Sequence, residues 1–190
     1  MKRFLLLLVV LLWTHTATAQ RTIPLNIEQL VRDAGTIIDG TVTGTRTGKD
    51  PESGLLVTWV TMNVNESFHG AVNGTITFKQ YGGEADGLAN YPKHLPRYAQ
   101  GERSILFLTA PSSIGMQSPV GMQQGKFMIV QEGTAKTVVR NLTKNPSLFT
   151  GLTVGKSLAK RAPASLEEDG TMDVEEFTSL VRSYVQLIKR

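Results

Sequence analysis

The residues best suited to chemistry gather in one long segment, from Gly82 to Gly101, that shows little hydrophobic periodicity. Glu84 and Asp86 stand on either side of an alanine, so they are a candidate pair of carboxylates for general acid–base catalysis. His94 lies in the same segment, and a loop of this length inside a compact domain is more often functional than idle. A hydrolase with its active site in residues 82–101 is therefore one hypothesis.

The sequence lacks the spacings that the common catalytic motifs require. His69 and His94 are the only histidines after residue 19, and neither stands in a paired metal-binding spacing. No G-x-S-x-G motif marks a nucleophilic serine. Polar loop residues are more often solvated than catalytic, so we expect no catalytic activity.

Tyrosines make the same segment suitable as a contact surface. Tyr81, Tyr91 and Tyr98 are rigid aromatic side chains of the kind that anchor binding interfaces. Two glutamines and a lysine flank a predicted buried strand, and we expect them to face the long loop across the mouth of the fold. The candidate residues for binding a ligand or partner are Tyr81, Gly82, Gly83, Glu84, Tyr91, His94, Gln123, Gln124 and Lys126.

Two later motifs resemble ligand-binding loops but depart from them. Residues 151–157, GLTVGKS, lack the first glycine of a phosphate-binding loop, because Thr150 stands in its place. Residues 165–176 match the second half of an EF-hand loop, but a serine occupies the first ligand position. A turn followed by a helix capping box explains the same residues. We expect no cofactor and no metal, with Asp169, Asp173 and Glu176 as a weaker calcium-binding alternative.

The composition excludes several classes of protein. The chain has no cysteine, which excludes disulfides, thiolate catalysis and cysteine-ligated zinc. Without Lys2 and Arg3, which belong to the predicted leader, the chain carries 18 basic and 16 acidic residues and is close to neutral. No run of lysine and arginine forms the basic stripe that nucleic-acid binding requires, so we expect no nucleic-acid partner.

The first 19 residues have the pattern of a secretory signal peptide. Lys2 and Arg3 precede ten consecutive apolar residues, and Ala17-Thr18-Ala19 follows as a small-residue cleavage signal. Such an apolar run is too short for a membrane-spanning helix, which needs roughly 20 residues. We expect cleavage before Gln20 and a secreted or periplasmic protein that has no membrane contact after cleavage.

The elements that must position the candidate site are mainly β-strands. Asn26, with Gln29 three residues later, is a capping box that starts a short helix ending near Gly35. Residues 56–68 alternate in polarity, and residues 104–108 form an apolar run typical of a strand buried on both faces. Further strands are expected at residues 36–42, 75–81, 119–121, 126–130 and 136–140, with a hairpin loop at 43–54. This pattern predicts an OB-like, partly open antiparallel β-barrel.

The last fifty residues change in composition and end in a clear helix. Asp173 is the expected N-cap, and an apolar stripe through the final helix predicts that it packs on the barrel. The expected organisation is a signal peptide at 1–19, a barrel domain at 20–145, a linker at 146–171 and a docked helix at 172–190.

Several motifs carry a resemblance to a known domain. They are LVRDA (30–34), IIDGTV (37–42), TMNV (61–64) leading to FHG (68–70), YGGE (81–84), GERSILFL (101–108) and VGMQQGKF (120–127). Their order resembles a domain of uncharacterised secreted bacterial proteins, which is also similar to the region preceding the catalytic domain of matrixin-type metalloproteases. More remotely, the layout resembles netrin-like OB barrels, which include the tissue inhibitors of metalloproteases.

The resemblance implies a fold more than an activity. The tissue inhibitors chelate the protease zinc through an amino-terminal cysteine, and this chain has none, so that mode of inhibition is not implied. Proteolysis is not implied either, because the metalloprotease motif is absent. The expected function is a secreted, non-catalytic binding or interaction module for an extracytoplasmic protein or glycan.

Overall fold

A computed structural model describes residues 23–133, 136–154 and 170–189, and the predicted signal peptide lies outside these residues. The first helix, α2 (Ile27–Asp33), begins with the expected capping box. The Asn26 side chain accepts a hydrogen bond from the Gln29 amide, and the Gln29 side chain accepts one from the Asn26 amide. This reciprocal pairing satisfies two backbone donors at the helix start, which is why the short helix begins there.

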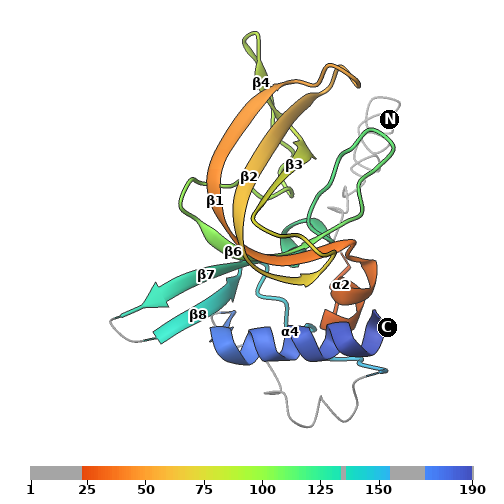
Figure 1. The fold of residues 1–190 in the computed structure, drawn as a ribbon, viewed down its shortest axis with the longest axis vertical. Coiled ribbons are helices and arrows are strands. Elements are labelled where there is room, and N and C mark those ends of the chain that lie inside the picture. The colour runs from red at the N-terminus through yellow and green to blue at the C-terminus, as the bar shows by residue number, and fades with distance from the viewer. Residues whose placement is uncertain (1–22, 134–135, 155–169, 190) are drawn as a thin grey trace, which may run out of the picture.

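An antiparallel seven-stranded sheet forms the body of the molecule (Figure 1). Its strand order is β3-β2-β1-β6-β7-β8-β9, and a separate two-stranded hairpin consists of β4 and β5. The strands are β1 (Thr36–Lys49), β2 (Leu56–His69), β3 (Thr75–Tyr81), β4 (Gly83–Ala85), β5 (Leu88–Asn90), β6 (Arg103–Leu108), β7 (Lys126–Glu132), β8 (Lys136–Asn141) and β9 (Thr171–Asp173). The sheet does not close into a barrel. The predicted mainly β, partly open antiparallel fold with a helix at each end is therefore confirmed.

Two hydrophobic clusters cover the two faces of the sheet, and β6 contributes to both. Ile105 and Phe107 face the helices, whereas Leu106 and Leu108 face the opposite side with Val60 and other residues of β1, β2 and β3. All four β6 side chains are fully buried, as the continuous apolar run predicts. We call the face that carries Val60 the inner face of the β1–β2–β3 sheet.

The C-terminal helix, α4 (Val174–Ile188), packs on the helix-facing cluster. Figure 1 shows α4 and α2 beneath the sheet, at the opposite end of the molecule from the β4–β5 hairpin. Phe177 is fully buried, and its ring lies 4.5 Å from that of Phe127 in β7. Arg182 also pairs with Glu66 of β2, but both side chains are at least one-third exposed, so this pair contributes at most about 1 kcal/mol. Apolar burial is therefore what holds α4 in place.

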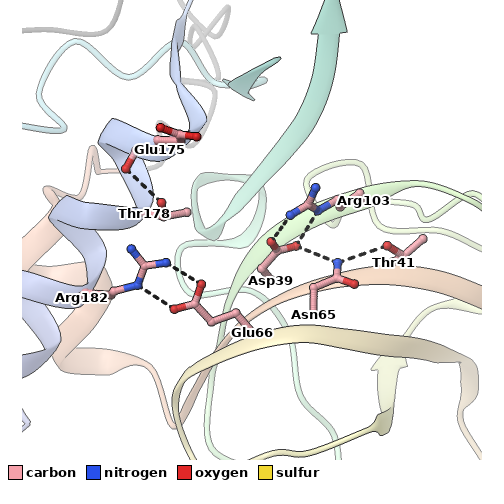
Figure 2. A network of polar contacts seen from close by, with 8 residues as sticks. All are labelled: Asp39, Thr41, Asn65, Glu66, Arg103, Glu175, Thr178 and Arg182. Atoms are coloured by element: carbon pink, nitrogen blue, oxygen red, sulfur yellow. Dashed lines mark hydrogen bonds and ion pairs between the residues drawn. The ribbon is translucent and has the colours of Figure 1, made fainter. Parts of the chain in front are cut away.

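A polar network joins β1, β2 and β6 close to α4 (Figure 2). Arg103 donates two hydrogen bonds, of 3.0 and 2.6 Å, to the buried carboxylate of Asp39. Asn65 donates a third to the same carboxylate and another to Thr41. Because Asp39 lies beside a register shift between β1 and β2, these bonds satisfy a charge where the strand pairing is irregular.

Three sequence-based predictions differ from the structure. Residues 43–49 continue β1 instead of forming a loop, because residues 44–49 pair with residues 56–61 of β2 after a register shift at Thr43. Residues 119–121 make one isolated bridge rather than a strand. The described part of the expected linker, residues 146–154, packs against α2: Leu148 is buried in the core, and its carbonyl oxygen accepts a hydrogen bond from the Ile27 amide. Among the described residues, no helix is long and apolar enough to cross a membrane.

Candidate binding pocket

The inner face of the β1–β2–β3 sheet changes from apolar to polar along the strands. Val60 pairs with Thr45 and Phe78, all within or beside the second hydrophobic cluster. Two residues further on, Thr58 pairs with Thr47 and Gln80. Because side chains two residues apart share a face, this polar row occupies the same surface as the core. The strands thus continue beyond the hydrophobic cluster, and their inner-face side chains there carry hydroxyl and amide groups instead of apolar groups.

A loop over residues 91–98 covers the polar row and leaves a pocket of about 180 Å³, which we call the mouth pocket. The strands contribute Thr45, Thr47, Thr58, Gln80 and Tyr81, followed by Gly82. The loop contributes Tyr91, Pro92, Leu95, Pro96, Arg97 and Tyr98. An engineered cavity of about 150 Å³ holds one benzene molecule, so the mouth pocket has room for about one six-membered ring.

Gly82 and Gly83 allow the chain to cross the end of the sheet at close range. Gly82 has a φ of +96°, and a Cβ on it would lie 2.6 Å from Cδ of Pro92. A Cβ on Gly83 would overlap the carbonyl oxygen of Val57. The Gly82 carbonyl also accepts a 2.7 Å hydrogen bond from the Thr58 hydroxyl. These two predicted site residues therefore shape the rim of the pocket through the backbone.

A buried lysine secures the far end of the loop. Lys126 is 3% exposed, and its Nζ lies 2.6 Å from Oε1 of Glu102 and donates a 2.6 Å hydrogen bond to the carbonyl of Arg97. The same ammonium lies 4.3 Å from the ring centroid of Tyr98. Desolvation lowers the pKa of Lys126, and the Glu102 carboxylate opposes that shift. Lys126 thus contacts the long loop at Arg97 and Tyr98, and it is not among the residues that line the mouth pocket.

The three tyrosines of this region have distinct surroundings. The Tyr81 hydroxyl accepts a 2.8 Å hydrogen bond from Asn90, and its side chain remains partly exposed at the rim. Tyr91 lies under the guanidinium group of Arg97, with Cζ 4.1 Å from the ring centroid. Tyr98 packs edge-to-face on Phe78. Tyr98 therefore joins the apolar core to the pocket.

Two buried polar atoms of the pocket residues have no hydrogen-bond partner among the described residues: Oε1 of Gln80 and the hydroxyl of Tyr98. The Gln80 amide nitrogen is satisfied, because it donates a 2.9 Å hydrogen bond to the carbonyl of Pro96. Burial, together with the negative charge of Glu102, raises the pKa of Tyr98 far above its usual range, so its hydroxyl stays protonated. An unpaired buried polar atom costs about 1–3 kcal/mol. Ser104 and Tyr184, which do not line the pocket, each carry another such atom.

Three other predicted site residues lie in a separate, smaller hollow of about 60 Å³: His94, Gln123 and Gln124. Gln124 is 5% exposed and has a structural role. It accepts a hydrogen bond from the Leu25 amide and donates one to the Ile23 carbonyl, which ties the described amino-terminal segment to the fold. Gln124 lines this hollow together with His94 of the long loop, while its polar side-chain atoms bind the backbone of the amino-terminal segment.

Glu84 lies apart from the other candidates, in the β4–β5 hairpin. It is exposed and borders a surface hollow together with Asp86 and Thr47. His94 belongs to a different hollow. The carboxylate pair and the histidine therefore do not form one catalytic group.

The phosphate-loop-like motif also acts within the fold. The amides of Thr153 and Val154 each donate a 2.8 Å hydrogen bond to the carboxylate of Glu28 in α2. The backbone amides of this part of the motif thus bind the carboxylate of Glu28. Residues 155–157 lie outside the described residues.

The structure describes two of the three residues of the calcium-binding alternative, because Asp169 lies outside the described residues. Asp173 is the N-cap of α4, and its carboxylate accepts hydrogen bonds of 2.9 and 3.1 Å from the amides of Glu175 and Glu176. Within the described part of the chain, no group of three or more His, Cys, Asp or Glu residues is arranged to hold a metal ion.

We expect Asp173→Ala to lower the free energy of unfolding by about 1 kcal/mol, because it removes this cap. Added calcium should leave the Tm of both the wild type and Glu176→Gln unchanged. Thermal denaturation with calcium and with a chelator measures both effects. A calcium-dependent rise in Tm that either substitution abolishes would contradict the capping role.

Several pocket residues were missed by sequence reasoning. Thr45, Thr47, Gln80 and Arg97 were not among the candidates. The available signal was the polar interruption at Thr58 in an otherwise apolar strand face. Thr58 indicates a polar row only when it is paired with Thr47 and Gln80, and that pairing is known only from the register of the three strands.

Comparison with known proteins yields no family model, no curated protein and no solved structure that matches this chain.

Proposed function

We propose that this protein is an exported, non-catalytic binding module whose mouth pocket takes one ring of an extracytoplasmic glycan. The observation that carries the proposal is the lining of a pocket of one-ring size, in which tyrosine rings and prolines lie beside threonine hydroxyl groups. A sugar ring combines apolar C–H faces with hydroxyl groups that both donate and accept hydrogen bonds. Such a ligand suits a small pocket with aromatic walls and a few polar groups.

The rest of the lining supports the same ligand class. Pro92, Leu95 and Pro96 provide apolar surface, and Thr45 and Thr47 provide hydroxyl groups that make no hydrogen bond within the described residues. A protein partner would instead need a broad interface of roughly 800 Å² per side, with an apolar centre. The compact, hydroxyl-lined mouth pocket fits a sugar better than it fits a protein surface.

The hydrolase hypothesis gains no support from the pocket lining. Its titratable residues are tyrosines and one arginine, and no carboxylate, histidine or serine is among the residues that line it. Glycoside hydrolysis ordinarily uses two carboxyl groups about 5–10 Å apart. The described pocket residues offer no such pair, so binding without turnover is the function that this geometry favours.

The proposal that the protein is exported depends on the amino-terminal sequence pattern alone. The basic pair, the apolar run and the cleavage signal of residues 1–19 favour a secreted or periplasmic location. Glycans of the cell envelope and of the surrounding medium are the polymers available in those compartments. The partner class and the location are therefore consistent with each other.

Tyr91→Ala should weaken glycan binding at least about tenfold, because it removes an aromatic wall of the pocket and the surface on which Arg97 rests. The test applies the purified protein to an immobilised glycan array and measures the affinity of each bound glycan in solution. Tyr91→Phe is the matched control, since it keeps the ring and should retain binding.

The array result distinguishes the possible outcomes. Binding that Tyr91→Ala removes and Tyr91→Phe retains supports the proposal. Binding that is unaffected by Tyr91→Ala places the glycan elsewhere and contradicts the proposed pocket. No bound glycan, together with a protein captured from the extracytoplasmic fraction through the same tyrosine, would replace the glycan with a protein partner.

A further inference from the structure

We propose that the sugar bound in the mouth pocket is acidic, of the uronic acid class, and that Arg97 binds its carboxylate. This inference rests on the proposed function and specifies its ligand. It is drawn from the charge of the pocket: the lining contains one guanidinium group and no acidic side chain.

Arg97, like Arg32 and Arg46, has no carboxylate partner among the described residues, but Arg97 alone of these three lines the mouth pocket. Arg103, Arg140 and Arg182 each lie 2.6 or 2.7 Å from a carboxylate oxygen. The guanidinium of Arg97 rests instead on the face of Tyr91. Stacking on Tyr91 covers the flat face of the guanidinium group but leaves the N–H groups at its edge able to donate hydrogen bonds. A carboxylate can accept hydrogen bonds from two of these N–H groups at once.

The backbone of Arg97 is held in place before any ligand binds. Its carbonyl accepts the hydrogen bond from Lys126, which is 3% exposed and paired with Glu102. A backbone that is fixed before binding reduces the entropy lost when a ligand binds.

The size of the pocket limits the anion to a single small group on a single ring. About 180 Å³ admits one ring, so the rest of a larger ligand lies outside the pocket. One guanidinium balances one negative charge, which is the charge of a uronate carboxylate. The hydroxyl groups of Thr45 and Thr47, which make no hydrogen bond within the described residues, remain to pair with ring hydroxyls.

The test compares two sugars that differ only at this carboxylate: methyl β-D-glucuronide and methyl β-D-glucoside. Each is titrated calorimetrically into the wild type, Arg97→Gln and Arg46→Gln. Arg46 is the matched control, because it also stacks on an aromatic ring, Trp59 at 3.8 Å, and its loss removes the same charge. Arg46 pairs with Trp59 between two inner-face pairs of the strands, so it projects from the opposite face.

We expect the wild type to bind the glucuronide at least about tenfold more tightly than the glucoside, the factor that corresponds to one charge-assisted hydrogen bond. Arg97→Gln should reduce the glucuronide affinity to that of the glucoside, whereas Arg46→Gln should leave the preference unchanged. An unchanged Tm for Arg97→Gln shows that the variant is folded.

Other outcomes separate this inference from the proposed function. Equal affinities for the two sugars, both lost with Tyr91→Ala and unaffected by Arg97→Gln, would overturn the acidic-sugar inference and leave the glycan pocket standing. A preference for the glucuronide that Arg46→Gln removes would place the anion on the opposite face and overturn the role of Arg97. Binding of neither sugar would overturn the inference and, with a blank glycan array, the proposed function as well.

Discussion

Replacing Phe177 by alanine should lower the free energy of unfolding by about 4 kcal/mol, the cost of removing a fully buried phenylalanine. The ring is inaccessible to solvent and contacts Phe127, which in turn lies edge-on to Phe107. The substitution therefore leaves a cavity where α4, β7 and β6 meet. For a chain of this size we expect the Tm to fall by roughly 10 °C.

Leu187→Ala is the matched control for this prediction. Leu187 belongs to the same helix but is 37% exposed, so its loss should cost less than about 1 kcal/mol. Urea denaturation followed by circular dichroism measures both variants. If Phe177→Ala unfolded at the wild-type urea concentration, α4 would contribute nothing to the stability of the sheet, and its packing in the structure would be wrong.

Lys126→Met should destabilise the protein by about 3 kcal/mol, because removing one partner of a buried ion pair leaves the other charge unpaired. The partner, Glu102, is only 18% exposed, so water replaces the lost interaction poorly. The carbonyl of Arg97 also loses its hydrogen-bond donor. The loop that covers the mouth pocket should therefore loosen, and sugar binding should weaken along with stability.

A double-mutant cycle separates the charge effect from simple loss of packing. Adding Glu102→Gln to Lys126→Met removes the stranded charge, so the double variant should be more stable than the sum of the single changes predicts. Arg140→Met breaks a pair whose partners are each more than one-third exposed and should cost less than about 1 kcal/mol. Strictly additive effects of the Lys126 and Glu102 changes would mean that the two side chains do not interact.

Local sequence signals were sufficient for the helices and the central strand. Capping residues mark the start of α2 and of α4, because the interaction of Asn26 with Gln29, and of Asp173 with the first turn of α4, spans only a few residues. The unbroken apolar run of β6 requires both faces to be covered, and both are. Such features depend on neighbours in the sequence and can be predicted from it.

The candidate site depends on contacts between residues far apart in the chain, so the sequence located it only approximately. Three residues predicted from this segment, Tyr81, Gly82 and Tyr91, line the mouth pocket, and their role in binding stays a prediction. The role of Lys126 could not be predicted, since a lysine next to a buried strand is usually solvated and its partner Glu102 lies just before a different strand, β6. The hydrogen bonds of Gln124 could not be predicted for the same reason, because its partners are backbone groups of the distant amino-terminal segment.

The most direct test of the central claim is to map where a sugar binds. Isotope-labelled protein is titrated with methyl β-D-glucuronide, and backbone amide shifts are followed by NMR. The account predicts that the shifts cluster and saturate together in residues 45–47, 80–82 and 91–98, around the polar row and the loop that covers it. Shifts confined to the opposite face around Trp59 or to the β4–β5 hairpin, with none in the mouth pocket, would contradict it.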